Sequence, residues 1–116
     1  MPTYTTTVTW PGGSSTVGTY INATGTAKED GGTPAAYVLK CTLANGANNY
    51  NNQENVSNSQ NWTVRIPSGT GTMATGSGYT LTVEMIVGGS TVATASVTGL
   101  TVSTIGPNSG GPIDPP

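Results

Sequence analysis

The sequence has little of the chemistry that most enzymes and nucleic-acid-binding proteins use. Its 116 residues include no His, no Phe, one Cys and eight charged side chains, and the net charge is −2. Without His and with only five carboxylates, few side chains could carry protons or hold a metal. Three basic residues make no electrostatic footprint for nucleic acid or an anionic membrane. We therefore expect no enzyme activity, no cofactor, no metal site, and no binding to nucleic acid or membrane.

The sequence also gives no indication of a disulfide, a leader segment or a membrane span. Cys41 has no second cysteine to pair with, and it alternates with Leu39 and Leu43, which predicts a buried free thiol. The first residues combine neither a basic segment nor an apolar run, and no apolar stretch approaches the length of a membrane span. We expect neither a secretory signal nor a transmembrane segment.

The abundant residues favour sheet over helix. Thr, Gly, Asn and Ser make up 59 of the 116 residues, and all four are poor helix formers. Apolar side chains recur at every second position in six segments, which is typical of half-buried strands. With a weak edge strand near Val56, the pattern predicts an all-β, antiparallel sandwich of about seven strands. The six segments are residues 4–10, 17–27, 36–43, 62–66, 79–87 and 91–102.

Turn residues divide these segments and suggest the domain limits. Gly88-Gly89 or Gly89-Ser90 is expected to close a tight hairpin, and a phase shift near Gly99 predicts a β-bulge. Residues 45–61 hold eight of the ten Asn residues and are predicted to form a long loop. Residues 1–105 are expected to form one domain, and the Pro- and Gly-rich residues 106–116 an extended tail or linker.

The alternation also predicts the core. In-phase large side chains are expected to fill it, and with no Phe the two Trp residues supply much of its volume. Tyr79 is expected to bury its ring and to donate its hydroxyl to the backbone. The predicted core residues are Trp10, Ile21, Leu39, Trp62, Val64, Tyr79, Leu81 and Val83.

Several segments resemble the immunoglobulin-like domains of bacteria and phages. They are residues 8–13 (VTWPGG), 21–27 (INATGTA), 61–67 (NWTVRIP) and 77–83 (SGYTLTV). The resemblance covers about residues 4–102 and implies an Ig-like β-sandwich with Tyr79 in a tyrosine corner. Two features depart from the family pattern: the Asn-rich stretch and the absence of the antibody-type Cys pair.

The resemblance implies contact functions and no catalytic residues. Such domains occur as phage capsid decoration or tail proteins, as repeats of bacterial surface adhesins and as accessory modules of secreted glycosidases. We expect a non-enzymatic structural module, a virion decoration (cement-type) protein. A bacterial adhesion or spacer repeat and an accessory carbohydrate-binding module remain alternatives. The corresponding partner is a capsid protein, an identical subunit or a surface glycan, and the location is the virion or the cell surface.

Exposed aromatic and amide side chains are the candidate contact residues. Tyr50 lies among Asn residues and Tyr20 is out of phase with its strand, so both could stack on a sugar or a partner. The alternative for Tyr50 is that it covers the edge of the core under its loop. The Asn-rich stretch contains one carboxylate, Glu54, too few for calcium. The candidate partner-binding residues are Tyr50, Asn48, Asn49, Asn51, Asn52, Tyr20 and Ile113.

Overall fold

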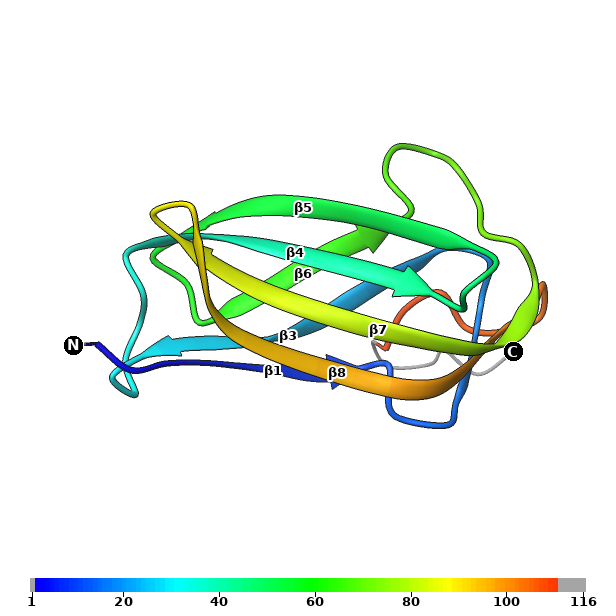
Figure 1. The fold of residues 1–116 in the computed structure, drawn as a ribbon, viewed down its shortest axis with the longest axis horizontal. Coiled ribbons are helices and arrows are strands. Elements are labelled where there is room, and N and C mark those ends of the chain that lie inside the picture. Colours follow the sequence, from blue (N-terminus) through cyan, green and yellow to red (C-terminus); the bar gives the residue numbers. More distant parts are fainter. Residues whose placement is uncertain (1, 111–116) are drawn as a thin grey trace.

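The computed structural model describes residues 2–110, and these form an all-β structure of two packed sheets (Figure 1). One sheet has three strands in the order β1-β3-β6, and the other has five in the order β2-β8-β7-β4-β5. All neighbouring strands are antiparallel except β2 and β8, which run parallel. The strands are β1 (Tyr4–Trp10), β2 (Thr16–Val17), β3 (Ile21–Glu29), β4 (Ala36–Ala44), β5 (Asn49–Ser57), β6 (Asn61–Ile66), β7 (Gly76–Val87) and β8 (Ser90–Val102).

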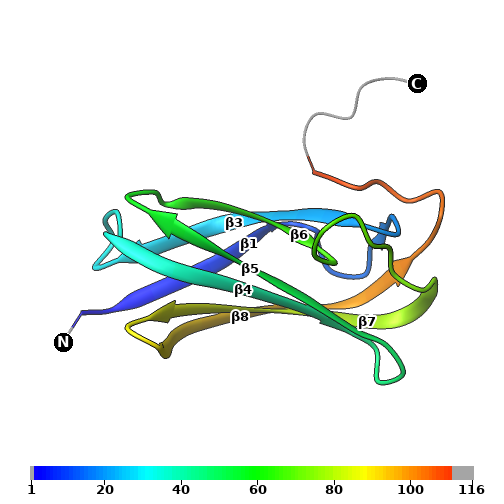
Figure 2. The ribbon, with the colours of Figure 1, turned by 90° about the horizontal axis from the view of Figure 1, so that it is seen from above.

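The all-β, sandwich-like class predicted from the alternation is confirmed. Figure 2 shows the two layers from above, with β5 inclined across one side of the sandwich. The β7–β8 hairpin turns at Gly88 and Gly89, whose φ angles of 60° and 84° suit a two-residue hairpin turn. Gly99 has a φ of 73° and lies where the β7–β8 register shifts, so the expected bulge is present.

The prediction that residues 45–61 form a long loop with only a weak edge strand near Val56 is wrong in its extent. Residues 49–57 form β5, which pairs with β4 along its whole length. The error arose because Asn is depleted in strands, whereas the hydrogen bonds of a β-ladder come from the backbone and tolerate any side chain that faces water. Tyr50 and Val56 are the two large apolar side chains of β5, and both pack against the core.

The predicted strand over residues 17–27 divides into two. Thr16 and Val17 pair with Thr101 and Val102 of β8, in one sheet, whereas β3 begins at Ile21 in the other. The chain therefore changes sheets within three residues. This division gives eight strands in the described residues instead of about seven.

The core lies between the two sheets, and Trp62 is one of its largest members. Seven of the eight residues expected there are buried, and Trp10 is only half-buried at the edge of the core. Trp10 departs from the expectation because its indole lies at the end of the sandwich, against the backbone of Gly110. The seven are Ile21, Leu39, Trp62, Val64, Tyr79, Leu81 and Val83.

Trp62 connects all three strands of the smaller sheet. Its Nε1 donates hydrogen bonds to the Thr6 hydroxyl on β1, at 3.2 Å, and to the Thr26 carbonyl on β3, at 3.1 Å. Gly25 on β3 is directly opposite Trp62 in the register, and the indole covers its Cα. The ring thus needs a residue without a Cβ at position 25 in order to reach β1.

The end of the described chain crosses from one sheet to the other. After β8, the Pro107 carbonyl accepts a hydrogen bond from the Gly18 amide, and the Asn108 carbonyl accepts one from the Asn22 amide at 2.8 Å. Figure 2 shows this segment passing from the β8 layer to the β3 layer. Residues 106–110 therefore pack on the sandwich. Residues 111–116, with the candidate contact residue Ile113, lie outside the described residues.

We predict that Gly25→Ala destabilises the fold. The added Cβ would lie 2.0 Å from the Thr7 carbonyl oxygen and 2.2 Å from Cζ2 of Trp62, so backbone or ring must shift. The expected loss in the free energy of unfolding is about 3 kcal/mol, measured by urea denaturation. Gly12→Ala is the control, because a Cβ there meets nothing within 4 Å, and it should change stability by less than about 0.5 kcal/mol. Equal stability of the two variants would contradict this account of Trp62.

Candidate functional site

The most regular polar surface is a row of side chains along β5. Alternation directs every second residue of this strand to the outer face of the five-stranded sheet, and all five members of the row are exposed. Four carry amides, which both donate and accept hydrogen bonds. We call this set the amide row, and it consists of Asn49, Asn51, Gln53, Asn55 and Ser57.

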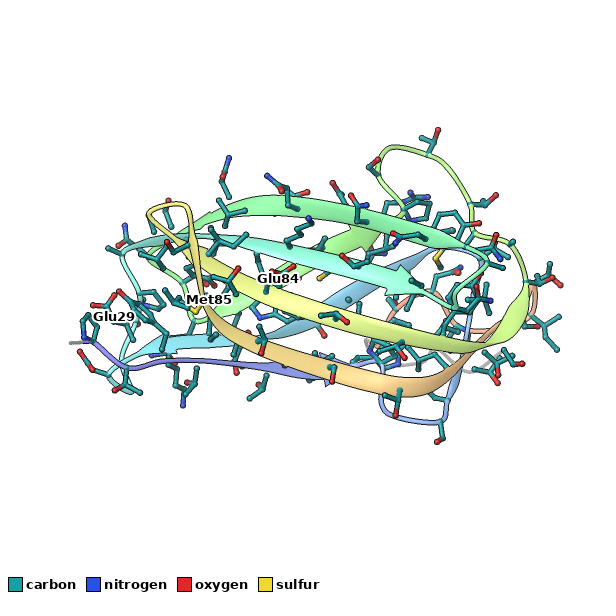
Figure 3. The ribbon with its side chains drawn as sticks, viewed as in Figure 1. Glu29, Glu84 and Met85 are labelled. Carbon is teal, nitrogen blue, oxygen red and sulfur yellow. The ribbon has the colours of Figure 1, made fainter. Side chains whose placement is uncertain are left out.

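The neighbouring strands extend the row into a wider polar face. Lys40 on β4 lies in register between Gln53 of β5 and Glu84 of β7, so the charges on this part of the face are balanced. Glu84 accepts a hydrogen bond from the Thr91 hydroxyl at 3.0 Å, while the next residue, Met85, is buried (Figure 3). The face thus offers many hydrogen-bonding groups with little net charge.

An apolar hollow of about 400 Å³ interrupts this polar face at the end nearest the β7–β8 hairpin. Val38 and Ile86 are paired across β4 and β7 and supply apolar surface, and Asn55 of the amide row lines the same hollow. A partner lying along β5 would therefore meet amides over most of its length and an apolar patch at one end.

Tyr50 and Asn52 are on the other side of β5 and make internal contacts. Tyr50 is half-buried, and its hydroxyl accepts a hydrogen bond from the Ala74 amide at 2.8 Å. The Asn52 side chain donates to the Arg65 carbonyl on β6 at 2.9 Å and so links the edges of the two sheets. These two candidates hold the sandwich together, whereas Asn49 and Asn51 belong to the exposed row.

The remaining candidates also lie in internal contacts. Asn48 ends the β4–β5 turn, where its amide donates to the Asn45 side chain and its carbonyl accepts from the Asn45 amide. The Tyr20 ring is covered on one face by the Arg65 guanidinium, 4.5 Å from the ring centroid, in a cation–π contact. Arg65 also donates to the carbonyls of Pro67 and Gly71, which fixes the β6–β7 loop.

Tyr79 has a structural position at the end of the core. Its ring is fully buried, and its hydroxyl donates to the Ala74 carbonyl, five residues upstream, at 2.7 Å. Burial raises the pKa of Tyr79, the nearby Tyr50 raises it further, and a hydrogen bond with Asn48 opposes the shift. Tyr79 and Tyr50 therefore bind the carbonyl and the amide of the same residue, Ala74.

Cys41 is a buried free thiol in β4. Burial raises its pKa to about 12, so at neutral pH it holds its proton and is a poor nucleophile. Within residues 2–110, no three His, Cys, Asp or Glu side chains cluster as they would around a metal. In the same range, every buried side-chain nitrogen and oxygen has a hydrogen-bond partner.

Gln53, Asn55 and Ser57 are the members of the amide row that sequence reasoning missed. Their period-2 spacing with Asn49 and Asn51 was a usable signal, but it was assigned to a loop because polar residues occupy both phases of most of the segment. Only Tyr50 and Val56 mark the inward phase. An alternation carried by two apolar residues six positions apart is too weak to indicate a strand by itself.

The chain matches no protein-family model, and a search of curated proteins also gives no match. Across the described part of the chain, no helix has the length and apolar character of a membrane span.

We predict that Tyr79→Phe costs more stability than Tyr50→Phe. Tyr79→Phe leaves the Ala74 carbonyl beside a buried ring without its donor, at a cost of about 1–3 kcal/mol in urea denaturation. Tyr50→Phe removes an acceptor from an exposed amide that water can satisfy, at a cost of about 0.5–1 kcal/mol. Hydrogen exchange of the Ala74 amide should accelerate in Tyr50→Phe. Unchanged exchange would show that this bond does not hold the loop.

We predict that iodoacetamide does not modify Cys41 in the folded protein at pH 8 and modifies it rapidly in denaturant, as mass spectrometry would show. The folded thiol ionises near 12, against an ordinary value of 9.0, so the unfolded chain loses its proton first. The free energy of unfolding should therefore decline as pH rises from about 9 towards 12. Rapid alkylation without denaturant would contradict this.

Proposed function

We propose that the chain is an Ig-like structural module of a larger protein assembly and not an enzyme. The strand order supports the Ig-like assignment, since β1, β3 and β6 correspond to strands A, B and E, and β4, β7 and β8 to C, F and G. In this correspondence β5 is the additional strand C′ of variable-type domains. Tyr79 near the start of β7, bonded to the Ala74 carbonyl, matches a tyrosine corner.

The observation that carries the proposed contact function is the amide row on β5. Charged residues such as Lys, Glu and Asp are depleted at the centres of protein interfaces, and the amide row contains no charged residue. The apolar hollow near Val38 and Ile86 adds a place where a partner side chain could be buried. Two exposed aromatics would suit a sugar platform better, but Tyr50 and Tyr20 are both engaged within the domain.

The setting that we propose is the surface of a phage virion, where the chain would bind a capsid protein. The resemblance to phage and bacterial Ig-like domains supplies this setting, and decoration proteins of that kind need contact surfaces and no catalytic groups. A weakly charged surface rich in Thr, Gly and Asn is compatible with such a role.

The proposal predicts that the chain copurifies with virions and that the amide row is required. Particles purified on a density gradient should contain the chain, as detected by mass spectrometry. Asn51→Lys with Asn55→Lys should remove most of it from the particles, because buried unpaired charge weakens an interface. Asn61→Lys, at an exposed position on β6 in the other sheet, is the folded control that should remain bound. A chain that never enters particles, or row variants that bind as well as the control, would overturn the proposal.

A further inference from the structure

β5 has a free edge along its whole length. One side pairs with β4 over nine residues, and in Figure 1 β5 is the outermost strand of its sheet. The bonds from the Asn45 amide to the Asn48 carbonyl and from the Asn58 amide to the Ala35 carbonyl flank this ladder. Opposed residues of an antiparallel ladder alternate between hydrogen-bonded and non-hydrogen-bonded pairs. The two flanking bonded pairs therefore show which of the pairs between them are hydrogen-bonded. The even-numbered residues of β5 therefore bond to β4.

The backbone amides and carbonyls of the amide row consequently point away from β4. Outside the β4–β5 ladder, these five residues make no backbone hydrogen bond within residues 2–110. Unpaired amides and carbonyls along an edge are a template for another strand. The row therefore offers both its side chains and its backbone to a partner.

The other edge strands have features that hinder pairing, whereas the single such feature of β5 is the charge of Glu54. β1 has a register irregularity between Val8 and Trp10, β2 has two residues, and the shorter β6 carries the cation Arg65 and is followed by Pro67. β5 has no Lys, no Pro and no break in register over nine residues. Natural proteins use such features to prevent edge pairing, so a long, regular edge without Lys or Pro favours β5 as the strand that pairs.

The sequence of β5 is complementary to itself in an antiparallel arrangement. A twofold axis through Gln53 overlaps all nine residues and places Asn51 opposite Asn55 of the second copy. Each residue of the amide row then lies opposite a row residue of the second copy. The backbone amides and carbonyls of both residues point toward the other copy, as a hydrogen-bonded pair requires. Their amide side chains can donate to one another as well as accept.

The opposite face of the strand fits the same register. Tyr50 would face Val56 of the second copy, an aromatic and β-branched pair of the kind that stabilises sheets. Glu54, the single charge of β5, would face Asn52 of the second copy. A two-residue shift that puts the axis at Glu54 would instead oppose two carboxylates, which is unfavourable. Charge thus disfavours the shift towards Glu54, and the register centred on Gln53 is the one that overlaps all nine residues.

We propose that two copies of this chain associate through antiparallel pairing of β5 about Gln53, so that their five-stranded sheets become one continuous sheet. This rests on the proposed role of β5 as the contact strand and names a second copy as its partner. The pairing leaves the outer face of the joined sheet, including Lys40 and Glu84, open to a further protein.

Sedimentation equilibrium of the full chain, from about 5 to about 500 μM, tests the association. We expect a reversible rise from 11.6 kDa to twice that mass. Gln53→Lys should raise the dimer dissociation constant at least about tenfold, because the axis brings the two cations together. Asn61→Lys, an exposed site on β6, should leave the constant unchanged. A chain that stays monomeric at the highest concentration, or a dimer indifferent to Gln53→Lys, would overturn the proposal.

Charge complementation tests the axis itself. Gln53→Glu should also dissociate the dimer, whereas an equimolar mixture of Gln53→Glu and Gln53→Lys should associate again, because position 53 then meets its opposite charge. Failure of the mixture to associate would overturn the register. A monomeric chain that still binds virions would refute self-pairing and leave the proposed function standing. A chain that forms the dimer but never binds virions would refute the proposed function and leave the self-pairing standing.

Discussion

The small sheet depends on one indole ring. Trp62 crosses the backbone of Gly25 and donates to Thr6 and Thr26, so a single side chain on β6 joins β3 and β1. The indole supplies both a large apolar volume and an N–H donor. Val64 and Ile66 follow Trp62 along β6 in the same phase, and both are fully buried in the core between the sheets.

A second constraint acts at the end of the sandwich where Tyr79 and Tyr50 meet Ala74. The two hydroxyls bind the carbonyl and the amide of one residue, and the Met73 amide donates to the Thr19 carbonyl at 2.7 Å. The β6–β7 loop is therefore held by side chains from β5 and β7 and by the backbone before β3. Because Tyr50 is used in this way, β5 presents its amide row, Glu54 and its backbone edge outwards.

The sequence allowed the all-β class and most of the core to be predicted, because buried strands alternate strongly. The phase of Trp62, Val64 and Ile66 indicated β6, and the glycines indicated the β7–β8 turn and the bulge at Gly99. The site was only partly predictable. Asn49 and Asn51 lie in the exposed row, but the strand that aligns them depends on pairing with β4, a long-range contact that no local pattern of Asn residues records.

The route of the described chain also has a mechanical consequence. Figure 1 shows β1 starting at one pole of the sandwich, whereas residues 106–110 lie towards the opposite pole. β2 and β8 run parallel, and the segment after β8 bridges Asn22 in parallel fashion as well. Tension between Pro2 and Gly110 would load these backbone bonds together in shear, so they would have to break at once and not one after another as in unzipping.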